Sequence, residues 1–130
     1  MDFTIEDIER ARERIASVIK STPLWRSETL NRIMDAEVLL KLENLQKTGS
    51  FKIRGAYNRV ASLAPPEAGR GVIAASAGNH GQALSWAATR AGVSATIVMP
   101  TTAAIAKVDA TRNYGQKVVL AGVDYQEARR

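Results

Sequence analysis

The stretch that decides the fold is Gly71-Val72-Ile73-Ala74-Ala75-Ser76-Ala77-Gly78-Asn79-His80-Gly81-Gln82. Its first five residues form a short apolar run, which predicts a buried strand. Gly78 then opens a helical pattern that runs to about residue 91 and ends at Gly92, because a glycine readily forms a helix C-cap. A strand that passes directly into a helix in this way is typical of an α/β fold.

The same alternation continues toward the carboxyl end. Residues 94–99 form a second apolar strand, residues 103–114 a helix followed by Gly115, and residues 117–120 a third strand. Residues 124–130 have the pattern of the first turns of another helix. Strands and helices that alternate with short connections predict a parallel sheet with right-handed crossovers and flanking helices. The predicted fold class is therefore α/β.

The amino-terminal part is less regular. Thr4 and Asp7 form a T-x-x-D capping box before a helix predicted over residues 5–20, and Pro23 follows its end because proline disfavours helical geometry in the preceding residue. The apolar residues that recur at helical spacing are Ile8, Ala11, Ile15, Val18 and Ile19. The later predicted elements are a short helix capped by Ser27 and ending near 34, a strand over 37–43, a loop over 43–49, and a helix over 50–64 that stops at Pro65-Pro66.

Composition narrows the classes of function. The 130 residues suit one small domain, and 45% hydrophobic with 24% charged residues is typical of a soluble protein. The absence of cysteine and the single histidine argue against disulfides, thiolate nucleophiles and cysteine or histidine-pair metal sites, so we expect no metal. The net charge of +5 is spread along the chain and only 5% of residues are aromatic, so we expect no nucleic-acid partner.

The sequence also shows neither the pattern of a membrane-spanning segment nor that of a signal peptide. No window approaches the roughly 20 apolar residues that a membrane span requires. The start Met1-Asp2-Phe3-Thr4 is acidic and unlike a signal peptide. We therefore expect a cytoplasmic protein with no membrane partner.

A second informative stretch, Ser50-Phe51-Lys52-Ile53-Arg54-Gly55-Ala56, places a lysine near a helix start and beside an aromatic ring. Unlike an arginine, Lys52 can lose its proton when it is desolvated, form a Schiff base and later act as a base. Phe51 and Ile53 flank it with apolar surface, and Gly55 leaves room for close backbone approach. Without this context, a lysine near a helix start is usually a surface residue.

Residues 76–82 lie at the junction of the strand over 71–75 and the helix after it. Free backbone N–H groups and the helix dipole at such a junction favour a carboxylate. The simpler alternative is an ordinary helix N-cap in which Ser76 or Asn79 accepts backbone hydrogen bonds. His80 taken alone would be structural rather than an acid or base.

The two stretches 50–56 and 76–82 together resemble the cofactor lysine and substrate loop of the fold-type II pyridoxal-phosphate enzymes, and among these the threonine/serine dehydratases. The resemblance implies that Lys52 binds pyridoxal 5'-phosphate as a Schiff base and that the ring of Phe51 lies near the cofactor ring. It also implies that the Asn79 side chain hydrogen-bonds the phenolic oxygen of the cofactor. The residues that would surround the substrate carboxylate, largely through backbone groups, are Ser76, Ala77, Asn79 and His80.

The resemblance runs through essentially all 130 residues and implies an incomplete fold-type II fold, of the tryptophan synthase β-like kind. Residues 1–130 would form the amino-terminal portion of a longer enzyme, with about 50–130 covering most of its smaller lobe. The family's glycine-rich phosphate cup and the polar partner of the pyridine nitrogen have no candidate in this chain. We expect a homo-oligomer for the complete enzyme and a fragment here.

The activity that the resemblance implies is β-elimination of water from L-threonine or L-serine, giving a 2-oxo acid and ammonia, in amino-acid metabolism such as isoleucine biosynthesis. Serine racemases of the family carry a serine immediately before the glycine of the substrate loop, where this chain has Ala77. A methyl group cannot exchange a proton, so the sequence favours a dehydratase. A racemase, a hydroxyaspartate-type dehydratase or a β-replacement synthase would also keep Lys52 and Asn79, and a non-catalytic fragment or interaction protein is the alternative outside enzymes.

Overall fold

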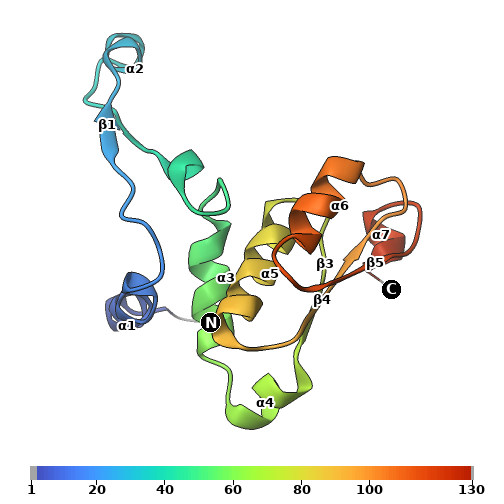
Figure 1. Cartoon of the computed structure of the whole chain (residues 1–130). Helices are drawn as coiled ribbons and strands as arrows, with labels where there is room; N and C mark the ends of the chain where they lie inside the picture. Colours follow the sequence, from blue (N-terminus) through green and yellow to red (C-terminus); the bar gives the residue numbers. More distant parts are fainter. Residues whose placement is uncertain (1–2, 130) are drawn as a thin grey trace.

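The computed structural model describes residues 3–129 and has the predicted α/β architecture. Strands β3, β4 and β5 form a parallel sheet in that order, and β1 pairs antiparallel with β2 in a separate sheet. Figure 1 shows β1 and α2 extending away from the parallel sheet and its helices. The elements in chain order are α1 (Ile5–Ala16), β1 (Leu24–Arg26), α2 (Glu28–Met34), β2 (Leu39–Lys41), the 3-10 helix η1 (Glu43–Leu45), α3 (Lys52–Ala61), α4 (Pro65–Arg70), β3 (Val72–Ala75), α5 (Asn79–Ala91), β4 (Ala95–Met99), α6 (Ile105–Arg112), β5 (Lys117–Leu120) and α7 (Tyr125–Ala128).

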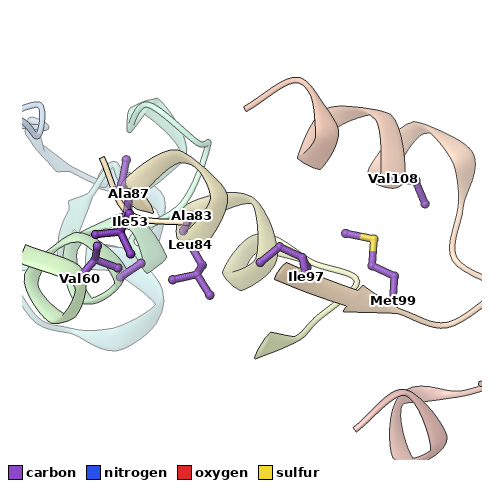
Figure 2. Close-up of a cluster of buried hydrophobic side chains, with 10 residues drawn as sticks. Ile53, Val60, Ala83, Leu84, Ala87, Ile97, Met99 and Val108 are labelled. Carbon is purple, nitrogen blue, oxygen red and sulfur yellow. The ribbon is translucent and has the colours of Figure 1, made fainter. Parts of the chain in front are cut away.

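The core lies where α3 packs on α5 and α5 packs on the central strand β4. Ile53 of α3, Ala83 and Ala87 of α5, and Ile97 and Met99 of β4 have no exposed surface. Figure 2 shows the side chains of α3 and α5 gathered on one side of this cluster and those of β4 and α6 on the other. Burial of apolar surface is the main stabilising term, so the first turn of α3 is anchored in the core at Ile53.

Several predicted boundaries and caps are confirmed. The Thr4 and Asp7 capping box is present, and the Ser27 side chain accepts a hydrogen bond from the Leu30 N–H at 3.3 Å. Gly92 caps α5 in the left-handed conformation with φ of 68°. The predicted strand over 117–120 is β5. Each of these features depends on residues within a few positions of one another, which a sequence pattern can reveal.

The predictions for the amino-terminal part need correction. Helix α1 ends at Ala16, not at residue 20, and Ile8 is 60% exposed although it belongs to the predicted apolar row. The strand β1 was not predicted, and the strand predicted over 37–43 is shorter, Leu39–Lys41. Both strands depend on their mutual pairing, which joins Leu24 to Lys41 across the intervening helix α2. Part of the loop predicted over 43–49 is the 3-10 helix η1.

Two further corrections concern the region between α3 and α5. Helix α3 is shorter than the predicted 50–64, and the chain does not stop being helical at Pro65-Pro66 but begins α4 there. Proline is tolerated in the first turn because its missing N–H needs no partner at that position. The strand predicted to be buried over 71–75 is β3, an edge strand, and its Ile73 is 72% exposed. The helix predicted over 103–114 is confined to Ile105–Arg112.

Candidate active site

The two sequence motifs meet in space. Helices α3 and α5 pack side by side, with the Lys52 stretch at the start of α3 and the Asn79 stretch at the start of α5. A pocket of about 470 Å³ lies between α3, β3 and α5. Its lining residues are Phe51, Lys52, Gly55, Ala56, Arg59, Val60, Val72, Ile73, Ala74, His80 and Leu84. The structure therefore brings Lys52, Phe51 and His80 to one cavity.

Lys52 is exposed and stands on the wall of this pocket. Its Nζ lies 5.1 Å from the centroid of the Phe51 ring, within the range of a cation–π contact. The next residue, Ile53, is fully buried, so the helix turns the lysine away from the core. The space beside Gly55 is open and belongs to the pocket, so this glycine leaves room for a ligand to approach the backbone.

His80 faces the same pocket from the first turn of α5. Its pKa is lowered from the usual 6.5, mainly because burial disfavours the charged imidazole and secondly because the charge of Lys52 is near. His80 is therefore mainly neutral at pH 7. The influence of Lys52 also places the two side chains within electrostatic reach of each other.

The loop before α5 is held by Ser76. Its Oγ accepts hydrogen bonds from the N–H groups of Gly81 at 3.0 Å and of Gly78 at 3.4 Å. The simpler reading of Ser76 as an acceptor of backbone hydrogen bonds is therefore correct for its side chain. The N-cap residue of α5 is Gly78, which offers no side-chain cap. The start of the helix thus keeps N–H groups available to an anionic ligand.

Gly81 makes this loop possible. A Cβ at that position would stand 2.6 Å from the Ser76 carbonyl oxygen and 3.1 Å from the Ile97 side chain. Ala77 is half-buried and packs against the core cluster, while Asn79 is exposed at the start of α5. The predicted carboxylate-binding residues are therefore consecutive or nearly so: Ser76 and Ala77 lie in the turn between β3 and α5, and Asn79 and His80 in the first turn of α5.

Sequence reasoning missed Arg59, which also lines the pocket. Lys52, Gly55, Ala56 and Arg59 all line it from α3, at spacings of three, four and seven residues. This spacing is the signal that could have revealed Arg59, since such residues share a helix face. The guanidinium pairs with Glu67 at 3.6 Å, and the Arg59 side chain is 65% exposed.

Among residues 3–129, no group of three or more His, Cys, Asp or Glu residues could hold a metal ion. None of the helices in the described part of the chain is both long and apolar enough to cross a membrane.

Comparison with known proteins identifies related sequences and folds. A family model described as pyridoxal-phosphate dependent enzyme matches residues 15–130. L-threonine ammonia-lyase from Thermotoga maritima is 50% identical over 126 residues, which cover 97% of this chain and 31% of that protein. The chain spans about a third of the length of the curated relatives it matches.

Two solved structures illustrate the likeness of fold. Serine racemase from Dictyostelium discoideum matches with a TM-score of 0.89 and 41% identity, over 96% of this chain and 41% of that one. The processed form of threonine deaminase isoform 2 from Solanum lycopersicum matches with a TM-score of 0.82 and 37% identity, over 98% of this chain and 38% of that one.

Proposed function

The chain belongs to the pyridoxal-phosphate-dependent enzyme family, and we propose that it forms the amino-terminal portion of an enzyme that eliminates water from L-threonine or L-serine. The products are a 2-oxo acid and ammonia. The observation that carries the proposal is that Lys52 and the first turn of α5 face one pocket. Curated relatives named threonine ammonia-lyase and threonine dehydratase support the dehydratase assignment.

The proposal extends to the organisation of the complete enzyme. Its fold is that of the fold-type II enzymes, of which this chain covers about two-fifths in the solved neighbours. Residues 1–130 would form the amino-terminal portion, with about 50–130 making up most of the smaller lobe. We also propose that the complete enzyme is a homo-oligomer and acts in the cytoplasm.

The residues around the pocket fit pyridoxal 5'-phosphate. The cavity of about 470 Å³ falls within the usual range for small-molecule sites. Phe51, Val72 and Leu84 give it apolar walls suited to an aromatic ring, and Lys52 contributes a primary amine. In this proposal Lys52 holds the cofactor covalently, Phe51 lies against its ring, and Asn79 donates a hydrogen bond to its phenolic oxygen.

The chain's own residues account for binding, orientation and proton transfer. Bound pyridoxal phosphate supplies an electron sink that spreads the negative charge of the reacting carbon. The N–H groups of Ala77, Asn79 and His80 bind the substrate carboxylate. The N–H of Ser76 donates instead to the Val98 carbonyl, and that of Gly78 to Ser76 Oγ. This contact orients the Cα–H bond toward Lys52, whose Nζ accepts the proton. His80, being mainly neutral at pH 7, can give or take one hydrogen bond there without adding charge.

Serine racemisation is the second candidate, because serine racemase is among the solved structures that the chain resembles. A racemase needs a proton donor on the face of the substrate opposite to Lys52. The methyl group of Ala77 offers none at the position where the family's racemases carry a serine. Elimination is therefore the activity that we propose.

The test is to map and remove the lysine in a complete enzyme that carries residues 1–130. Borohydride reduction of the cofactor-bound protein, followed by peptide mapping, should place the label on Lys52. Lys52→Ala should lower the rate of 2-oxobutyrate formation from threonine by at least about 10³-fold, since it removes both covalent attachment and the base. Label on Lys41, Lys47 or Lys107 would contradict the proposal. Lys107→Ala is the control and should leave the rate unchanged.

A further inference from the structure

An ion-pair cluster lies directly beside the Lys52 stretch. Arg54 donates two hydrogen bonds to Glu43, from Nε to Oε2 at 2.8 Å and from Nη2 to Oε1 at 2.7 Å. Thr22 Oγ1 donates a third to Oε1 at 2.5 Å, and the Lys41 amine donates to the carbonyl of Thr22. A two-pronged contact of this kind fixes the direction of both side chains as well as their distance.

This pair differs from the other ion pairs among residues 3–129. The Glu43 and Arg54 side chains are 16% and 31% exposed, whereas every partner in the other pairs is at least 43% exposed. Arg54 lowers the pKa of Glu43 to about 2, and Glu43 raises the pKa of Arg54. Both groups therefore keep their charges throughout the pH range in which the protein would work.

The Glu43–Arg54 pair joins the two ends of the segment over residues 43–54, which contains Lys52. Gln46 lies inside this segment and is 3% exposed. Its Nε2 donates to the Lys20 carbonyl at 2.8 Å, and its Oε1 accepts from the Lys20 N–H at 2.9 Å. Thr48 and Ser50 are also buried. The segment is thus tied to residues 20–22 at two points before it enters α3.

Two anchors of different kinds follow Lys52 directly in the chain. Ile53 fixes the first turn of α3 in the core, and Arg54 fixes it to Glu43. Apolar packing of Ile53 holds the turn in place but is non-directional, so by itself it leaves the turn some freedom to rotate. The ion pair removes this freedom, since its two parallel hydrogen bonds admit one orientation.

We infer that Glu43 and Arg54 are positioning residues, which hold the first turn of α3 so that the Lys52 amine faces the cofactor pocket. This inference rests on the proposed function, since it concerns the amine that would bind the cofactor. Stability alone is a weak reason for such a pair, because charged pairs removed from water are often replaced by apolar residues at no cost. Orientation is a better reason, since a reacting group misplaced by about 1 Å can lose about 10²-fold in rate.

The test measures how selectively Lys52 reacts. The 130-residue chain is incubated with pyridoxal phosphate and sodium borohydride. A lysine amine forms a C=N bond with the aldehyde carbon and releases water; hydride then adds to that carbon and a proton to the nitrogen, leaving a stable secondary amine. Peptide mapping gives the ratio of label on Lys52 to label on Lys107, an exposed lysine of α6 in the same molecule. Irreversible trapping accumulates label even when the cofactor binds weakly.

Four variants separate positioning from folding. Arg54→Gln and Glu43→Gln remove the ion pair. Arg54→Lys keeps the positive charge but cannot form the two parallel hydrogen bonds to Glu43. Glu28→Gln is the matched control, because it breaks the exposed pair with Arg26. We expect the wild-type chain to favour Lys52, the first two variants to lower the ratio about tenfold, Arg54→Lys to recover part of it, and Glu28→Gln to leave it unchanged. Urea unfolding of each variant shows whether it remains folded.

The outcomes are distinguishable. A wild-type chain that labels Lys52 no more than Lys107 would defeat this inference, whereas label on another lysine in the complete enzyme would defeat the proposed function. A wild-type preference that survives intact in folded Glu43→Gln and Arg54→Lys chains would defeat the inference alone. If the two Gln variants unfold, Arg54→Lys is the deciding variant. The inference then requires that its ratio of label on Lys52 to label on Lys107 falls while its urea unfolding midpoint stays close to that of the wild type.

Discussion

Ala77 is the single side chain that most sharply separates the two candidate reactions. It is half-buried in the turn between β3 and α5, next to Ser76, whose hydroxyl is already engaged with the N–H groups of Gly78 and Gly81. The methyl group of Ala77 has no proton to return to the substrate, and the Ser76 hydroxyl serves as the acceptor that holds the turn. This arrangement agrees with elimination as the proposed reaction.

We predict that Ala77→Ser raises racemisation in a complete enzyme carrying residues 1–130. The added hydroxyl supplies a proton donor and acceptor at the position where the family's racemases carry one. Incubation of L-serine with the unmodified enzyme should give pyruvate and little D-serine by chiral chromatography, and the variant should form several-fold more D-serine. Abundant D-serine from the unmodified enzyme would show that another group supplies the second proton. Ala77→Gly serves as a control that adds no hydroxyl.

The Glu43 carboxyl makes the unfolding free energy of the protein depend on pH in the acid range. Its pKa falls from the usual 4.5 to about 2 on folding, chiefly through the hydrogen bonds from Arg54. A carboxyl whose pKa is lowered by folding stabilises the protein fully above pH 4.5 and loses that contribution as the pH falls toward 2. After allowance for solvent screening, we predict a loss of about 2 kcal/mol in unfolding free energy over this range.

Urea unfolding at pH 5, 4, 3 and 2 measures this loss. The Glu43→Gln chain has no carboxyl at this position. Between pH 5 and pH 2 its unfolding free energy should therefore fall by about 2 kcal/mol less than that of the wild type. Glu28→Gln is the comparison, because Glu28 is exposed in its pair with Arg26. Parallel pH curves for the wild type and Glu43→Gln would refute the assignment of the acid-sensitive contribution to this carboxyl.

At the scale of elements, the junction of β3 and α5 depends on the absence of a side chain at Gly81. Ser76 lies at the end of β3, and its carbonyl oxygen would be 2.6 Å from a Cβ on Gly81. A contact this short requires the backbone to move, and the fully buried Ile97 stands behind it. The strand and the helix can therefore approach as they do only with glycine at this position.

We predict that Gly81→Ala lowers the unfolding free energy by about 1–3 kcal/mol, the usual cost of overpacking a core. It should also lower labelling of Lys52 by pyridoxal phosphate and borohydride, because the start of α5 would be displaced. Gly69→Ala is the matched control: no atom lies within 4 Å of the added Cβ, and Gly69 is inside helix α4, so this change should be neutral or slightly stabilising. Equal stability of the two variants would show that the junction adapts without cost.

For the whole molecule, the most prominent feature is apolar surface on the segment that extends away from the parallel sheet. Figure 1 shows β1 and α2 at the far end of this segment. The strands β1 and β2 have three residues each and are exposed along their whole length. A two-stranded pair of this size is marginally stable by itself. The large apolar residues exposed here are Leu24 at 62%, Trp25 at 64%, Ile33 at 69%, Met34 at 63%, Leu39 at 50% and Leu40 at 40%.

We predict that the 130-residue chain alone binds pyridoxal phosphate weakly, fails to dehydrate threonine and self-associates. Its pocket has walls from α3, β3 and α5. The sequence offers no candidate for the glycine-rich phosphate cup or for the polar partner of the pyridine nitrogen that the family resemblance implies. Hydrogen bonds to charged groups contribute roughly 1.5–3 kcal/mol each, so the loss of several weakens binding by orders of magnitude. Exposed apolar patches promote association.

Absorbance titration with the cofactor, an assay for 2-oxobutyrate and sedimentation velocity measure these three properties. Trp25→Lys should shift the sedimentation profile toward the monomer, while Thr29→Lys, on the neighbouring exposed surface, should not. Tight stoichiometric binding with turnover would overturn the view that this chain is an incomplete enzyme.

The sequence alone determined the features that depend on near neighbours. Capping side chains, helical spacing and apolar strand runs act over a few residues, so α1, α2, α5 and β5 could be recognised from local patterns. The same holds for the two motif stretches, since each is a continuous run of residues. The α/β fold class followed from the alternation of strands and helices along the chain.

Only the tertiary structure decided what depends on contacts between distant residues. The pairing of β1 with β2, the exposure of Ile73 on an edge strand and the Glu43–Arg54 pair all join residues whose local patterns carry no sign of the partner. The helical spacing shows that Arg59 shares a face of α3 with Lys52, but the pocket that both residues line exists only where α3, β3 and α5 meet. Such contacts form only when folding brings distant elements together, and that arrangement is a property of the whole chain.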